Sequence, residues 1–144
     1  MSYLDGLFGR GAIPVLEKTL AFQEARHTLL VQNIANASTP GYRPADLDEK
    51  GFQHLLSAAV QAREAQHPRE FRLGRSEEIW TDAEGHLQTQ ASPVREGQVR
   101  HDGNPFNAER EMSRLADNAL AHQMTSQLLA GNFQLMELAI RGRV

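Results

Sequence analysis

The chain has 144 residues, enough for one domain, but its 40% hydrophobic and 6% aromatic content favours elongated helices over a compact enzyme core. A formal net charge of −3, with 15 scattered lysines and arginines, gives no basic face, so nucleic acid is not an expected partner. Cysteine is absent, which excludes disulfides and thiolate metal sites. No stretch approaches the roughly 18 consecutive apolar residues of a membrane-spanning helix.

The N-terminal part of the chain reads as a short irregular segment followed by a long helix. Residues 1–11 contain three glycines and lack the basic and continuous apolar regions of a cleavable signal peptide. A helical pattern begins near Ile13, with Pro14 well placed in the first turn. Apolar side chains cover more than one face of this helix, so we expect it to pack against more than one neighbour. One row, interrupted by Gln23, contains Ile13, Leu16, Leu20, His27, Leu30 and Ile34, and a second contains Val15, Phe22 and Leu29.

The end of this helix carries a defined stop signal. Pro40 disfavours the helical region at Thr39, and Gly41 accepts the positive φ of a type II turn. Asn33 and Asn36 are three residues apart, on one face of the last helical turns. Their amides are expected to bind unpaired carbonyls or a neighbouring chain.

The ten residues Asn33-Ile-Ala-Asn-Ala-Ser-Thr-Pro-Gly-Tyr42 resemble the N-terminal signature of the flagellar axial proteins, the rod, hook and hook-associated family. Three further segments are similar to those of a proximal rod member: Asp102-Gly-Asn104, Arg110-Glu-Met112 and Ala139-Ile-Arg-Gly142. The resemblance covers roughly residues 10–46 and 102–142.

Residues 44–103 are interrupted by proline and glycine too often for a long element. A helix is predicted over residues 52–64 from its apolar spacing. Alternation predicts short strands at Phe71-Arg-Leu73 and His86-Leu-Gln-Thr89, joined by a longer connection, because no tight-turn dipeptide lies between them. We interpret this region as a surface insertion and not as a second core.

The last segment predicts a second long helix, capped by Asn107, with Glu109 and Glu111 favourably placed near its start. Gly131 costs about 1 kcal/mol relative to alanine inside a helix, so either it permits a close helix contact or the helix is not continuous there. A heptad row runs through Met112, Leu115, Ala119, His122, Ser126, Leu129, Phe133, Met136 and Ile140. A second apolar side contains Leu120, Met124, Leu128, Leu135 and Leu138.

The expected fold is mainly α, with the N- and C-terminal helices packed as an antiparallel, coiled-coil-like pair around an irregular middle insertion that holds a short helix and a weak hairpin. The organisation is residues 1–43 for the first helix and its motif, 44–103 for the variable middle and 104–144 for the last helix. Pairing the two helices covers one face of each, so the remaining apolar faces predict contact with other subunits. Identical units in a head-to-tail, non-closing contact form a helical tube.

The family resemblance implies a structural subunit of the proximal rod of the bacterial flagellar basal body, which transmits torque for motility. It implies export through the flagellar type III apparatus without a cleaved signal peptide, and a location in the periplasmic rod. Its implied partners are other rod proteins, the adaptor FliE and the export gate. The alternative is a cytoplasmic helical binding module or export chaperone that uses the same apolar rows to hold a partner.

An enzyme is not expected. No two of the six histidines are three or four residues apart, and no nucleophile, phosphate-loop or dinucleotide motif occurs. We therefore predict no catalytic, cofactor, metal or small-molecule site. The predicted functional surface is an assembly interface formed by Leu20, Leu30, Asn33, Ile34, Asn36, Thr39, Pro40, Gly41, Tyr42, Met112, Leu115, Leu129, Phe133, Met136 and Ile140.

Overall fold

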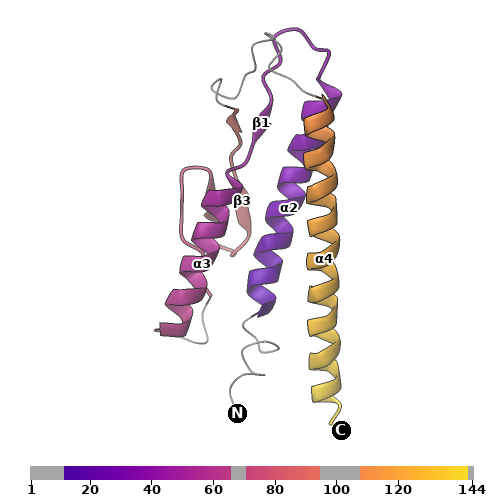
Figure 1. Ribbon diagram of the computed structural model, residues 1–144. Coiled ribbons are helices and arrows are strands. Elements are labelled where there is room, and N and C mark those ends of the chain that lie inside the picture. The colour runs from indigo at the N-terminus through magenta and orange to yellow at the C-terminus, as the bar shows by residue number, and fades with distance from the viewer. Residues whose placement is uncertain (1–11, 66–70, 95–107, 143–144) are drawn as a thin grey trace.

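The computed structural model describes residues 12–65, 71–94 and 108–142, and in these ranges the chain is mainly helical (Figure 1). The predicted irregular segment 1–11 and the predicted cap at Asn107 lie outside the described residues. The helices are α2 (Ala12–Ala35), α3 (Glu49–Ala65) and α4 (Ala108–Ile140). The strands are β1 (Ala45–Asp46), β2 (Ile79–Thr81), β3 (Leu87–Thr89) and β4 (Ser92–Pro93).

Helices α2 and α4 lie side by side and run in opposite directions, which confirms the predicted antiparallel pair (Figure 1). The two helices differ in length, with 24 residues in α2 and 33 in α4. At about 1.5 Å per residue, α4 is longer by roughly 14 Å. Its C-terminal end extends past the first residue of α2 (Figure 1).

The hydrophobic core lies on the other side of α2, against the middle region. Its buried residues are Phe22 from α2 together with Leu47, Phe52 and Ile79. The rings of Phe22 and Phe52 stack with centroids 4.1 Å apart and planes inclined by 3°. The middle region is therefore part of the main core, contrary to its interpretation as a surface insertion. Leu47 and Ile79 come from segments too short to show an apolar period, so the sequence did not indicate that they join this core.

The predicted hairpin exists, but one of its strands is not the expected one. Strand β2 pairs antiparallel with β3, with Trp80 opposite Gln88. Residues 71–73 form no strand; Leu73 packs against the core instead. Ile79 is fully buried, so core packing selects this segment over the alternating one. A second small sheet joins β1 to β4.

The turn after α2 has the predicted geometry. Gly41 has a φ of 76°, and the Tyr42 amide donates a hydrogen bond to the Thr39 carbonyl at 3.2 Å. A Cβ atom added at Gly41 would meet no other atom within 4 Å. Glycine is therefore required here for its backbone conformation and not for space. The predicted turn is thus confirmed, whereas α2 already ends at Ala35, before the Ala37-Ser-Thr39 segment at which its end was expected.

The face of α4 that meets α2 is more polar than predicted. Its buried residues are spaced seven apart and are all polar: Glu111, Asn118, Thr125 and Asn132. The second heptad position is as predicted, and Leu115, His122, Leu129 and Met136 are partly buried. At the first heptad position the prediction is wrong by one residue. The buried residue in each heptad directly precedes the one that was predicted from the apolar pattern. Consequently Met112, Phe133 and Ile140 are 56%, 47% and 84% exposed, and Ala119 is also exposed.

Candidate assembly interface

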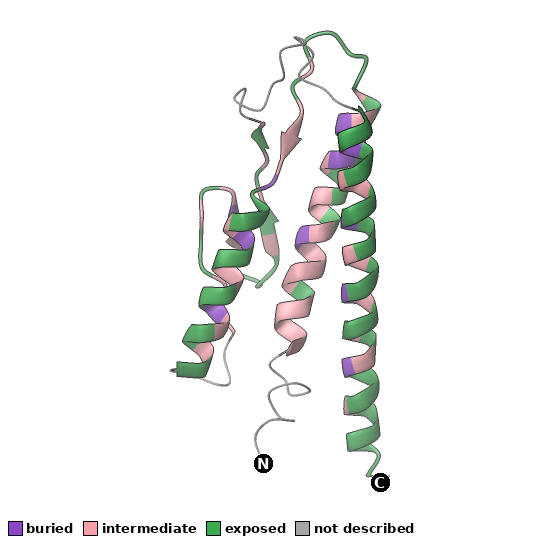
Figure 2. Cartoon of the chain, viewed as in Figure 1, coloured by how far each residue is buried: buried purple, intermediate pink, exposed green. Residues whose placement is uncertain are grey.

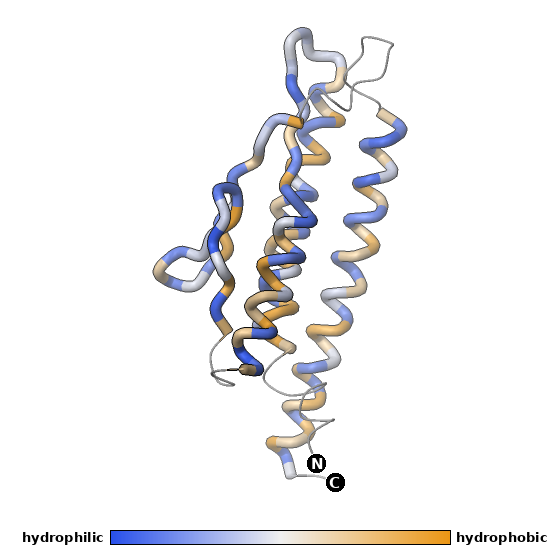
Figure 3. The backbone as a smooth tube through the Cα atoms, turned by 60° about the vertical axis from the view of Figure 1, so that its left-hand side comes forward, coloured by the Kyte–Doolittle hydropathy of each residue, from blue (hydrophilic) through white to orange (hydrophobic). Residues whose placement is uncertain are grey.

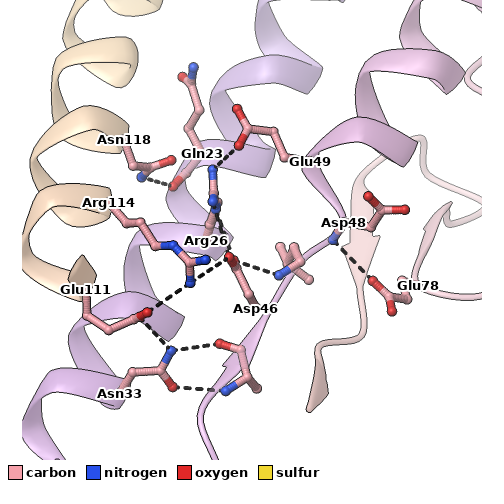
Figure 4. A network of polar contacts seen from close by, with 12 residues as sticks. Gln23, Arg26, Asn33, Asp46, Asp48, Glu49, Glu78, Glu111, Arg114 and Asn118 are labelled. Carbon is pink, nitrogen blue, oxygen red and sulfur yellow. Dashed lines mark hydrogen bonds and ion pairs between the residues drawn. The ribbon is translucent and has the colours of Figure 1, made fainter. Parts of the chain in front are cut away.

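Asn33 joins the end of α2 to the segment that follows the turn (Figure 4). It is 1% exposed. Its Nδ2 donates to the Ala45 carbonyl at 2.8 Å, and the Ala45 amide donates to its Oδ1 at 3.1 Å. The same Nδ2 donates to Glu111 Oε2 of α4 at 3.2 Å, and the Tyr42 hydroxyl donates to Oδ1 at 2.9 Å. One amide side chain therefore connects three parts of the chain.

An ion-pair network continues from this point along the α2–α4 boundary (Figure 4). Arg26 Nε donates to Asp46 Oδ1 at 3.0 Å, and Arg26 Nη1 to Glu49 Oε2 at 2.5 Å. Arg114 of α4 lies 2.9 Å from Glu111 and 3.9 Å from Asp46. Burial alone would lower the pKa of Arg26, but its hydrogen bond with Asp46 and the charges of Asp46 and Glu49 raise that pKa above its ordinary value. The network fixes β1 to both long helices.

The rest of the motif forms a turn that faces solvent. Asn36 Nδ2 donates to the Gln32 carbonyl at 2.8 Å, but this carbonyl also accepts the Asn36 backbone amide at 3.0 Å, so it is not the unpaired carbonyl that was predicted. Thr39, Pro40 and Gly41 are exposed, whereas Tyr42 is partly buried. The turn is therefore available to a neighbouring molecule, and its role in assembly remains a prediction.

The predicted interface residues of α2 are only partly accessible. Leu30 is 0% exposed, and Asn33 is buried with it, so neither offers surface to another subunit. Leu20 and Ile34 are partly buried. These residues shape the fold that presents the interface.

Among the described residues, the exposed large hydrophobic side chains lie on α4, with the exception of Val31. The buried residues of α4 lie on the side toward α2, and most of the remaining surface is open (Figure 2). Hydrophobic residues recur along its whole length (Figure 3). We define the outer stripe as Leu120, Met124, Leu128, Leu135 and Leu138, which are 60%, 58%, 58%, 43% and 55% exposed.

The predicted interface omitted the outer stripe, although the spacing of its residues by three, four or seven positions signals it in the sequence. From Asn118 to Met136 the helix carries no lysine, arginine, aspartate or glutamate. Gly131 lies within this uncharged stretch, and a Cβ built on it meets nothing within 4 Å. Such a surface suits packing against another uncharged helix better than recognition of a charged ligand.

The described residues give little support for a metal site or a membrane-spanning helix. Across residues 12–65, 71–94 and 108–142, histidines and carboxylates do not gather in groups of three that could hold a metal ion. Within the same ranges, no helix combines the length and hydrophobicity needed to cross a membrane.

Comparison with known proteins identifies the class. No protein-family model matches the chain. The chain is, however, similar to curated flagellar basal body rod proteins from distant bacteria. The relative from Escherichia coli strain K12, the flagellar basal body rod protein FlgB, is 30% identical over 132 residues, covering 87% of this chain and 89% of that protein.

Two further relatives carry the same name, FlgB. The one from Cereibacter sphaeroides is 31% identical over 142 residues, covering 92% and 96% of the two chains. The one from Bacillus subtilis strain 168 is 24% identical over 132 residues, covering 92% and 95%. These shares include the middle region, where the sequence motifs gave no resemblance. The chain belongs to the FlgB family of flagellar basal body rod proteins.

Proposed function

We propose that this chain is a structural subunit of the proximal rod, where it assembles with copies of itself and with other rod proteins into a helical tube that transmits torque. The outer stripe of α4 carries this proposal, because it is a long, uncharged and exposed apolar surface in a member of a rod-protein family. The role is mechanical and involves no catalysis.

The free energy for assembly would come from burying this stripe. Complete burial of a large apolar side chain contributes about 1.5–3 kcal/mol, and the five stripe residues are now roughly half exposed. Contiguous apolar patches of this kind mark sites of protein association. A head-to-tail contact between such faces forms a helical tube when its rotation does not close into a ring.

Torque transmission requires subunits that do not deform. The Asn33 contacts and the Arg26–Asp46–Arg114 network fix the exposed turn at residues 39–41 relative to both long helices. A turn held this way can transmit force between neighbouring subunits. We propose that the base of the tube contacts the adaptor FliE and the export gate, and that the assembled subunit lies in the periplasm after export without cleavage.

The test is a charge placed on the stripe. Leu128→Asp should leave the free energy of unfolding of the isolated chain within about 0.5 kcal/mol, because the side chain is 58% exposed. It should abolish swimming and the recovery of the subunit in purified basal bodies, because assembly would bury an unpaired carboxylate.

The matched control is Ala130→Asp, which adds the same charge at an exposed position about 200° around the helix from Leu128. It should preserve motility. Normal swimming by the Leu128→Asp strain would contradict the proposal. Cell fractionation addresses the export-chaperone alternative, since a chaperone remains in the cytoplasm and a rod subunit sediments with basal bodies.

A further inference from the structure

Gly131 forms a notch in the outer stripe of α4. It lies three residues after Leu128 and four before Leu135, so all three share one face of the helix. A Cβ atom added at Gly131 would meet nothing within 4 Å, and the two leucines beside it are 58% and 43% exposed. A glycine between two exposed leucines can accept a large side chain from a partner helix, as a hole accepts a knob.

The stripe and its notch are arranged symmetrically along the helix. Three pairs of positions share a midpoint at residue 129, to within half a residue: Leu128 with Gly131, Met124 with Leu135, and Leu120 with Leu138. When two α4 helices pack antiparallel about this midpoint, each position lies level with its pair in the other copy. Leu128 of each copy then enters the notch at Gly131 of the other. The stripe is therefore complementary to itself.

The charges at the two ends of the stripe favour the same orientation. Asp117 lies three residues before Leu120, and Arg141 lies three residues after Leu138, so the same midpoint relates them. Both are exposed, and Arg141 also binds Glu137 of its own helix. An antiparallel pair places Asp117 of each copy level with Arg141 of the other, where opposite charges attract.

A parallel pair of α4 helices fits this surface poorly. It would place the two Asp117 carboxylates side by side, where like charges repel. It would also place Gly131 opposite Gly131, which leaves the notch empty and forfeits the contacts that a filled hole provides. The observations thus select the antiparallel arrangement of two copies.

We propose that the isolated chain forms a closed antiparallel dimer in which the outer stripe binds α4 of a second copy. A two-fold contact uses the same surface on both copies, so the dimer recruits no further subunit. It differs in this from the open contact of the proposed tube, and the two contacts compete for the same leucines. The role of the dimer rests on the proposed function: it covers the stripe before assembly and dissociates when the subunit joins the tube.

Sedimentation equilibrium of the full-length chain tests the dimer. We expect a monomer–dimer equilibrium at concentrations up to about 0.1 mM, without larger species. Gly131→Leu should raise the dissociation constant of the dimer at least about tenfold, because it fills the notch that receives Leu128. A chain that stays monomeric, or that forms open-ended oligomers, would overturn the proposal.

The matched control for the filled notch is Ala130→Leu. It adds the same side chain at an exposed position about 100° around the helix from Gly131, away from the stripe. The dissociation constant should remain unchanged in this variant. Equal weakening by the two substitutions would show that the notch is not part of the contact.

Disulfide formation between two single-cysteine variants tests the orientation, since the chain has no native cysteine. A mixture of Leu120→Cys and Leu138→Cys chains should oxidise mainly to the disulfide that joins the two different variants, because bonding requires close Cβ atoms. Either variant alone should oxidise at least about tenfold more slowly, since its two cysteines would lie about 27 Å apart. Faster oxidation of either variant alone would indicate a parallel pair and refute the proposal.

The dimer and the rod contact can fail separately. A monomeric chain whose Leu128→Asp variant does not swim would refute the dimer and retain the proposed rod contact. A dimeric chain whose Leu128→Asp variant swims normally would refute the rod contact, and with it the role of the dimer in protecting the stripe.

Discussion

Asn33 binds Ala45 as a neighbouring β-strand would, with its side-chain amide donating to the Ala45 carbonyl and its oxygen accepting from the Ala45 amide. A single side chain at the end of α2 thus satisfies both backbone groups of a residue twelve positions later. Since it also binds Glu111 and Tyr42, the amide has no equivalent substitute.

Replacing Asn33 with aspartate should therefore destabilise the isolated chain. The change removes the donor to Ala45 and brings a second carboxylate to the buried Glu111. We expect the free energy of unfolding to fall by about 2–4 kcal/mol in urea denaturation at neutral pH. Gln32→Glu adds the same charge at an exposed neighbour and should cost less than about 0.5 kcal/mol. Equal losses in the two variants would show that the network is unimportant.

The polar inner face of α4 predicts that one asparagine can be replaced with a gain in stability. Asn132 donates only to Leu128 of its own helix, and its buried Oδ1 has no partner among the described residues. Asn132→Leu should raise the free energy of unfolding by about 1 kcal/mol.

Asn118 is the matched control for that substitution, because its amide donates to the Gln23 carbonyl of α2 at 2.9 Å. Asn118→Leu should lower the free energy of unfolding by about 1 kcal/mol. Urea denaturation of both variants checks the pair, and a loss for Asn132→Leu as large as that for Asn118→Leu would contradict the explanation.

Two glycines with equally open surroundings should respond in opposite directions to alanine. Gly41 has a positive φ, so Gly41→Ala should cost about 1–2 kcal/mol of unfolding free energy. Gly131 lies inside α4, so Gly131→Ala should add up to about 1 kcal/mol. Thermal and urea unfolding measure both changes. A destabilised Gly131→Ala chain would show that space is more restricted there than the structure indicates.

Acid should weaken the β2–β3 hairpin through Asp82. Hydrogen bonds from Gln88 and from the His86 amide lower the pKa of Asp82 below its ordinary value. Because the folded pKa is depressed, this stabilisation is present above the pKa of the unfolded chain and is lost as pH falls through the folded pKa. Carboxyl titration by NMR should show the shift, and Gln88→Leu should bring the Asp82 pKa closer to its ordinary value. An unchanged pKa in Gln88→Leu would exclude Gln88 as a cause.

Local sequence signals determined the helices, the turn and the family. The spacing of apolar residues predicted both long helices, and Pro40-Gly41 predicted the turn, because these features depend on backbone sterics and helical period, which act within a few residues. The apolar spacing also indicated the outer stripe, although the predicted assembly interface did not include its residues.

Only the tertiary structure decided which face of each helix is buried and where the core lies. Two of the four buried inner positions of α4, Glu111 and Asn118, are polar because they bind backbone and side-chain groups of α2, and a hydrophobic pattern does not reveal such partners. Thr125 and Asn132 donate to carbonyls of their own helix instead. Ile79 and Leu47 enter the core with Phe22 and Phe52 from segments too short to show a period. Apolar periodicity determines that a face will be buried, whereas the contacts of the folded chain decide whether it is buried within the molecule or left for a partner.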